Sequence, residues 1–208
     1  MPYSAAVGEI RKRQPTGAAV LQADVTEAIT EAVLDELADT GYGKLSMEAV
    51  ARRAGVGKSA LYRRWPSKQE MVMAVVADFS IDRAAAPDTG SLRGDLAGLV
   101  HAFTEWLTHP RISRILPDLA AEGVRNAELA EAVRAAIGGP RRTIGAAVLQ
   151  RAIARGELPA DTDLELALDL IAAPVYWRLS VRGAPVEPGY LDAVADAVLR
   201  ALTGRMAP

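Results

Sequence analysis

The stretch 45–68 constrains the fold more than any other part of the sequence, because it has the pattern of two short helices joined by a tight turn. Ser46 is a favourable N-cap for a helix that ends near Ala54. Gly55 then tolerates the positive φ that a tight turn needs, and a second short helix is predicted over 57–65. The pattern predicts a helix-turn-helix.

The apolar residues of this stretch are spaced to hold the second helix against the first. Ala51 supplies the small residue that a close helix crossing requires, four residues before the turn glycine. The larger residues that complete the contact are Val50, Ala54, Val56 and Leu61, with Leu45 and Met47 beneath them. Because all these demands are met in one window, a helix-turn-helix is favoured over an ordinary helix pair with a solvated charged face.

The same window concentrates positive charge in a chain whose formal net charge is −2. Between Tyr42 and Lys68, seven basic residues stand against one acid, Glu48, which makes this window +6 and the remainder −8. The exposed positions of the second helix carry short polar, methyl, phenolic and cationic groups of the kind that contact base edges and phosphates. These residues are Lys58, Ser59, Ala60, Tyr62, Arg63 and Arg64. The window is therefore predicted to bind double-stranded DNA.

Helical periodicity continues along the rest of the chain, and apolar and polar residues nowhere alternate over a long stretch. Further helices are predicted at 23–40, 67–82, 92–108, 112–122, 127–137, 141–155, 163–181 and 190–202. Gly41 is the expected C-cap of the first, and Gly138-Gly139-Pro140 indicates a break. Pro117 and Pro174 are expected to kink or interrupt their helices. The prediction is an all-α protein of about nine or ten helices.

The segment Thr40-Gly-Tyr-Gly-Lys-Leu-Ser-Met-Glu-Ala-Val-Ala-Arg-Arg-Ala-Gly-Val-Gly-Lys-Ser-Ala-Leu-Tyr-Arg-Arg-Trp-Pro-Ser-Lys-Gln-Glu-Met71 resembles the N-terminal signature of the TetR family of repressors. The preceding helix, 24–39, matches as well. Towards the C-terminus, 156–178 is similar to members with a Gly-Glu-Leu…Pro-x-Tyr-Trp-Arg pattern. The resemblance implies a homodimeric, ligand-responsive, DNA-binding transcriptional regulator, typically a repressor of a palindromic operator.

The resemblance also assigns roles in DNA binding to individual residues. It places Lys58, Ser59 and Ala60 at base edges, and Tyr62 and Lys68 at phosphates. The N-terminus of a helix together with a lysine is a phosphate site on physical grounds too. The cap residue Ser46 is expected to reach the DNA backbone as well.

One position departs from the family pattern, because members usually have Ser or Thr where Gly57 stands. Glycine caps a helix almost as well, but a hydroxyl–phosphate contact is lost.

Three parts follow from this organisation. Residues 1–20 form a flexible basic arm, 21–68 the helix-turn-helix domain with a linking helix at 67–83, and 84–208 the ligand-binding and dimerisation domain. The arm carries Arg11, Lys12 and Arg13, which resemble N-terminal extensions that enter the minor groove. A plain disordered tail is the alternative interpretation.

The last two long helices are the predicted dimer interface, because both are strongly apolar and two from each subunit would form a four-helix interface. The residues predicted to make it are Leu168, Ile171, Val175, Leu179, Leu191, Val194, Val198 and Leu202. The alternative is that these helices only close the core of the monomer.

Bulky residues in the middle helices are candidates for a pocket that binds a small molecule of unknown identity. The candidates are His101, Phe103, Trp106, Leu116, Tyr176 and Trp177. For each of them, packing in the core is the competing explanation.

No catalytic motif is present: the chain has no Gly-rich phosphate loop, no Gly-x-Ser-x-Gly and no His-Glu-x-x-His. His101 and His109, eight residues apart in a chain without cysteine, do not form a metal site. We therefore expect no enzymatic activity, no cofactor and no metal.

The absence of cysteine, of a signal-peptide pattern and of long apolar runs leads us to expect a cytoplasmic protein without a membrane partner. One alternative stays open, namely a ligand-independent activator or DNA-organising protein of the same fold.

Overall fold

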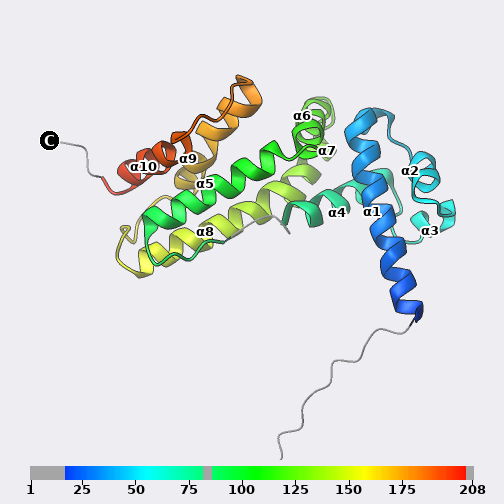
Figure 1. Ribbon diagram of the computed structural model, residues 1–208, viewed down its shortest axis with the longest axis horizontal. Helices are drawn as coiled ribbons and strands as arrows, with labels where there is room; N and C mark the ends of the chain where they lie inside the picture. Colours follow the sequence, from blue (N-terminus) through cyan, green and yellow to red (C-terminus); the bar gives the residue numbers. More distant parts are fainter. Residues whose placement is uncertain (1–16, 82–85, 205–208) are drawn as a thin grey trace, which may run out of the picture.

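The computed structural model describes residues 17–81 and 86–204 of the chain (Figure 1). Every regular element in these two ranges is a helix, which confirms the all-α prediction. The N-terminal part contains α1 (Gly17–Lys44), α2 (Met47–Ala54), α3 (Lys58–Tyr62) and α4 (Lys68–Ile81). In Figure 1 the short helices α2 and α3 lie beside α1, and α4 leads from them towards the second part.

The C-terminal part is a bundle in which α5 contacts α6, α8, α9 and α10. At the end nearest the N-terminal part, α6 packs on α1 (Figure 1). The elements of the bundle are α5 (Leu92–Thr108), α6 (Ile112–Gly123), α7 (Ala127–Val133), the π-helical η1 (Arg134–Gly138), α8 (Gly139–Ala154), α9 (Leu164–Tyr176), the π-helical η2 (Trp177–Val181) and α10 (Tyr190–Leu202).

The predicted break at Gly138-Gly139-Pro140 is wrong, because α7, η1 and α8 follow one another without a gap. Both glycines have right-handed helical backbone angles. The wider π turn, in which Gly139 donates to the carbonyl of Arg134, explains the continuity. A proline ring clashes with the carbonyl four residues before it in a regular α-helix, and a π turn moves that carbonyl aside.

Pro117 and Pro174 also lie inside helices, α6 and α9, and neither ends its helix. Downstream of Pro174 the chain enters η2, which closes with a 2.8 Å hydrogen bond from the Arg182 N–H to the Trp177 carbonyl. The predicted helix over 163–181 is thus present, with a π-helical last turn.

Gly41 bends α1 near its C-terminal end. Its backbone has φ 77° and ψ 165°, which fits the predicted role of a residue that ends a helix, although one further turn continues to Lys44. A Cβ atom on Gly41 would lie 2.6 Å from Oδ1 of Asp118 on α6. The glycine therefore serves both the left-handed backbone and the close approach of α6.

One continuous cluster of buried apolar side chains joins the two parts of the molecule. It extends from α1 through α4 to the bundle, and it includes Val33 and Leu37 of α1, Val72 and Val76 of α4, and Ile115 and Leu119 of α6. A movement of α6 would therefore shift α1 as well, because close-packed cores transmit strain.

Candidate nucleic-acid interface and apolar cavity

The turn between α2 and α3 has the local geometry that its residues predict. The Oγ of Ser46 accepts a 3.1 Å hydrogen bond from the N–H of Ala49 and so caps α2. Gly55 adopts left-handed angles, φ 67° and ψ 27°, and its N–H donates to the carbonyl of Ala51. The next residue, Val56, donates to the same carbonyl at 3.0 Å. These hydrogen bonds give a carbonyl in the last turn of α2 its partners, while the chain changes direction towards α3.

The predicted apolar contact between the two helices is present. Ala51, Val50 and Leu61 are buried, and Ala54 and Val56 pack against the same cluster. α3 therefore has one side fixed against α2 and the other free.

The recognition helix α3 is shorter than the predicted 57–65, since its last α-helical residue is Tyr62. Gly57 stands at its N-cap without a side-chain hydrogen bond. After α3 the chain continues in a turn, in which the N–H groups of Arg64 and Trp65 both donate to the carbonyl of Leu61 at 2.9 Å.

The outward face of α3 carries most of the residues predicted to contact DNA. Lys58, Ser59, Tyr62 and Arg63 are exposed, and Ala60 is half-buried. Tyr62 has 49% of its surface free, which is unusual for a large side chain with an apolar ring. An exposed phenol between cations is suited to a phosphate contact.

Several cations of this face already have partners inside the protein. Lys58 forms a 2.9 Å ion pair with Glu48 of α2, and the hydrogen bond from Lys58 lowers the pKa of the Glu48 carboxyl. Arg64 donates at 2.7 Å to the Thr26 hydroxyl on α1. Over the described ranges, Arg63 has no carboxylate within ion-pair distance.

Lys68, at the start of α4, turns its ammonium group back towards α1. It donates at 2.8 Å to the carbonyl of Tyr42 and lies 4.3 Å from the centre of the Tyr42 ring. A capping box lies beside it, because the Ser67 Oγ accepts from the Glu70 N–H and donates to the Glu70 carboxylate, both at 3.1 Å. Arg11, Lys12 and Arg13 lie outside the described residues.

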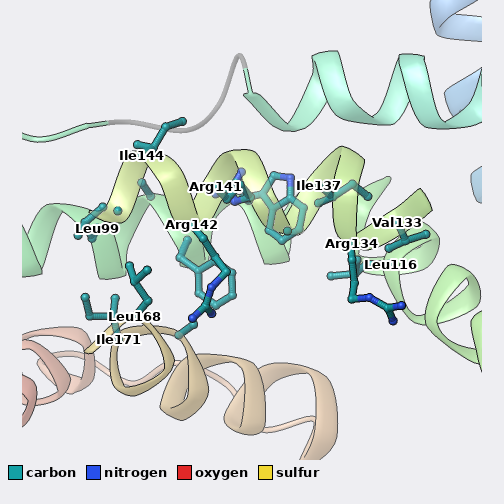
Figure 2. Close-up of a pocket in the computed structure, with 16 residues that line it drawn as sticks. Leu99, Leu116, Val133, Arg134, Ile137, Arg141, Arg142, Ile144, Leu168 and Ile171 are labelled. Carbon is teal, nitrogen blue, oxygen red and sulfur yellow. The ribbon is translucent and has the colours of Figure 1, made fainter. Parts of the chain in front are cut away.

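A cavity of about 330 Å³ lies between α5, α8 and α9, with its far end at α6 (Figure 2). Its wall is mostly apolar, and the charged residues that the structure describes in it are Arg134, Arg141 and Arg142. The apolar lining residues include Leu99, Phe103, Trp106, Leu116, Ile137, Leu168 and Ile171.

Three of the six residues predicted for a pocket, Phe103, Trp106 and Leu116, line this cavity. The other three do not: His101 is exposed and bonded to the carbonyl of Ala97, and Tyr176 and Trp177 lie 39% and 59% exposed on the outside of the bundle. The arginines were missed although they lie in the predicted helices 127–137 and 141–155, because only bulky apolar, aromatic and histidine side chains were taken as pocket candidates.

Five residues predicted for the dimer interface belong instead to the core of the single chain. Leu168, Ile171, Val175, Val194 and Val198 are buried without any partner subunit. Both Leu168 and Ile171 line the cavity. Leu179, Leu191 and Leu202 are half-buried.

The free apolar surface of α9 and α10 includes a shallow groove between the two helices. It is lined by Leu170, Pro174, Tyr190, Ala193, Val194, Ala197, Val198 and Ala201, so two of the predicted interface residues, Val194 and Val198, border it. Nearby, Leu166 and Trp177 have more than half of their surface exposed.

A helix-turn-helix with an exposed cationic recognition helix, attached to a helical bundle with its own cavity, defines a DNA-binding transcription regulator. The chain belongs to the TetR family. Residues 29–75 match the model for bacterial regulatory proteins of the tetR family, and residues 86–198 match the tetracyclin repressor-like C-terminal domain.

Similar proteins cover nearly the same span. The chain is 32% identical to the uncharacterized HTH-type transcriptional regulator YdeS of Bacillus subtilis, over 86% of this chain and 88% of that one. It is 31% identical to the DNA-binding transcriptional repressor TetR of Mycobacteroides abscessus, over 84% and 92%. The crystal structure of the TetR family regulator SCO0332 aligns with a TM-score of 0.70 at 33% identity, covering 89% of this chain and all of that one.

No helix in the described ranges is long and apolar enough to cross a membrane. No group of three or more potential metal-ligating side chains occurs in them either.

Proposed function

We propose that the protein is a homodimeric repressor that leaves a palindromic operator when a small molecule enters the bundle. The observation that carries this proposal is a continuous set of contacts from the cavity to the DNA-binding part. Leu116 lines the cavity on α6, and Asp118 of the same helix accepts a 2.7 Å hydrogen bond from the N–H of Tyr42. The repressor name of the Mycobacteroides abscessus relative supports the direction of regulation.

In this proposal α3 enters the major groove with Lys58, Ser59 and Ala60 at base edges. Tyr62 and Arg63 contact phosphates beside it, since both are exposed and free of carboxylates. The exposed pair between Lys58 and Glu48 costs little to open, because surface ion pairs contribute about 0–1 kcal/mol.

Four further groups complete the proposed interface. Among the residues that the structure describes, Arg64 has a neutral hydroxyl as its hydrogen-bond partner, so its charge is available to a phosphate. Ser46 and Lys68 flank α3 and add backbone contacts. The arm with Arg11, Lys12 and Arg13 supplies minor-groove contacts.

Dimerisation would occur through the groove of α9 and α10. A groove lined by alanines lets a partner helix approach closely, and the exposed Leu166 and Trp177 add apolar area beside it. Pairing is needed because two recognition helices about 34–36 Å apart read two half-sites of a palindrome.

Binding of a ligand would act through two contacts between the bundle and the DNA-binding part. One is made by α6, which packs on α1, and the other by α4, which packs on η1. Asp118 holds the main chain of Tyr42, and the carbonyl of the same Tyr42 holds Lys68. A shift of α6 would therefore move the start of α4 relative to α3 and change the spacing of the two recognition helices.

The test begins with a selection of genomic fragments by the purified protein, followed by fluorescence anisotropy on the recovered sequence. Replacing both Tyr62 and Lys68 by Ala should weaken binding broadly, whereas Lys58→Ala should alter the base preference. Light scattering at micromolar concentration should give the mass of a dimer.

Undiminished binding by the double variant would overturn the assigned phosphate contacts, and a monomer mass would overturn the pairing. Activation rather than repression of a reporter, unaffected by any small molecule, would favour the ligand-independent alternative.

A further inference from the structure

The charges in the wall of the cavity are unbalanced. Arg134 is paired with Glu131 at 2.6 Å, and Arg142 is paired with Glu165 and Asp169 of α9. Arg141 has no carboxylate within ion-pair distance among the residues that the structure describes. Among the residues that the structure describes, no acidic side chain lines the cavity.

Arg141 is held in place by two neutral groups. Its guanidinium lies over the indole ring of Trp106, 4.1 Å from the ring centre. Its Nη1 donates a 2.8 Å hydrogen bond to the carbonyl of Ser80, in the last turn of α4. A guanidinium has five N–H donors in a planar fork, so one such bond leaves most of them without a partner.

Burial has a measurable effect on this group. Desolvation lowers the pKa of the Arg141 guanidinium to about 10, and no neighbouring anion offsets it. The group is still protonated at neutral pH, so the cavity wall contains a cation that is removed from water and has no counter-charge within the described part of the chain. Buried charges in proteins are ordinarily paired.

The remaining wall is complementary to an apolar body. Phe103 and Trp106 are stacked, with ring centres 6.0 Å apart and planes at 28°. Leu99, Ile137 and Leu168 complete the surface around them, and Trp106 is 4% exposed. A mostly apolar cavity with a few polar or charged groups is the usual composition of a small-molecule site.

We propose that the cavity binds an organic monocarboxylate, whose carboxylate pairs with Arg141 and whose apolar body lies against the rings of Phe103 and Trp106. This inference rests on the proposed function and identifies the chemical class of its ligand. One unpaired guanidinium matches one carboxylate, which accepts two parallel N–H bonds from the fork. A neutral molecule of the same shape leaves the cation unpaired.

The position of Arg141 also connects the ligand with α4. The bond to the Ser80 carbonyl holds the C-terminal turn of this helix, and Lys68 is at its other end. A carboxylate that takes the N–H groups of Arg141 competes with that carbonyl. Ligand binding would loosen α4 from α8 at the end opposite to the DNA-binding residues.

The experiment uses matched probes on the full-length protein, namely aliphatic and naphthyl carboxylic acids and the primary amide of each. Isothermal titration calorimetry should show that at least one acid binds about tenfold or more tightly than its amide, because only the acid supplies a charge-assisted pair. Arg141→Met keeps the length and apolar stem of the side chain, and it should remove this preference. Arg141→Lys should retain part of it.

The matched control is Arg125→Met, which removes an equal charge from an arginine 77% exposed at the end of α6, away from the cavity. It should leave the preference of the acid over the amide intact. Equal affinity for acids and amides, a preference that survives in Arg141→Met, or no binding of any acid at millimolar concentration would each overturn the inference.

Anisotropy of the operator complex separates this inference from the proposed function. If an acid binds through Arg141 but does not release DNA, the ligand class holds and the inducer role fails. If only amides or other neutral compounds release DNA, the inducer role holds and the carboxylate assignment fails.

Discussion

The carboxylate of Asp118 accepts a 2.7 Å hydrogen bond from the main-chain N–H of Tyr42, and the two residues are 76 positions apart. The bond joins α6 to the bend of α1. In the proposed mechanism it connects the two functional parts, because Leu116 of the cavity lies two residues before Asp118.

Asp118→Leu should uncouple the ligand from the DNA. The change leaves the N–H of Tyr42 without an acceptor, so we expect a loss of about 1–3 kcal/mol in the free energy of unfolding, measured by urea denaturation. DNA should still bind, but a bound ligand should release it less. Asp118→Asn retains an acceptor oxygen and should retain both properties; an equal defect in the two variants would contradict the role of this bond.

Three glycine variants should rank in a definite order of stability. Gly41→Ala combines a positive φ with a 2.6 Å contact to Asp118, and Gly55→Ala has a positive φ in open space. Gly43→Ala has neither, since its Cβ would meet only the end of the Glu122 side chain at 3.3 Å. Left-handed backbone alone costs about 1–2 kcal/mol for a residue with a Cβ. Thermal unfolding should therefore show the largest loss for Gly41→Ala and the smallest for Gly43→Ala.

Glu48→Gln should strengthen DNA binding. The acid holds the amino group of Lys58 at 2.9 Å and places a negative charge beside the recognition helix. Removing it should raise the affinity about twofold to tenfold at low salt, with less gain at high salt. The free energy of unfolding should change by less than about 0.5 kcal/mol, because the pair is exposed. Unchanged affinity at low salt would contradict the placement of Lys58 at the DNA.

Asp95 should make the bundle sensitive to acid. Burial alone would raise the pKa of this fully buried carboxyl, but the hydrogen bonds from the Thr89 N–H, the Thr89 hydroxyl and Arg155 outweigh it and lower the pKa. A carboxyl with a lowered pKa in the folded state stabilises the protein above its unfolded pKa, about 3.9. That contribution is lost as the pH falls below about 4, through the lower folded pKa.

Asp95→Asn tests this relationship. The variant should be less stable than the unmodified protein at pH 7, and the difference should shrink as the pH falls below about 4. Melting temperatures across this range provide the measurement, with Asp88→Asn as the control, since Asp88 is mostly exposed and only 3.8–3.9 Å from its partner arginines. A constant difference at all pH values would argue against the stabilising role of the carboxylate.

Two neighbouring groove residues of α10, one exposed and one buried, should respond differently to substitution. Ala197→Glu places a charge in the exposed groove and should shift the protein to a monomer, with weaker operator binding, while its melting temperature as a monomer is retained. Val198→Ala removes buried methyl groups, and we expect a loss of about 1–3 kcal/mol in stability. Light scattering distinguishes the two effects, and a dimeric Ala197→Glu would place the interface elsewhere.

Local features were predictable from the sequence because their determinants are close together in the chain. The cap at Ser46, the turn at Gly55 and the capping box at Ser67 each depend on hydrogen bonds over three to five residues. The helical periods and the charge of the 42–68 window likewise need no knowledge of the fold. The helix-turn-helix was therefore recognisable from short-range chemistry alone.

Only the tertiary structure decided which apolar face points where and which charge lacks a partner. Leu168 and Val198 have the same helical spacing as interface residues, but burial against their own chain assigns them to the core. Arg141 lies beside Ser80 and Trp106, and Asp118 accepts a hydrogen bond from Tyr42. Both arrangements depend on contacts between helices that are far apart in the sequence. Periodicity shows that a helix face is apolar, but not whether its own bundle, a ligand or a second subunit covers it.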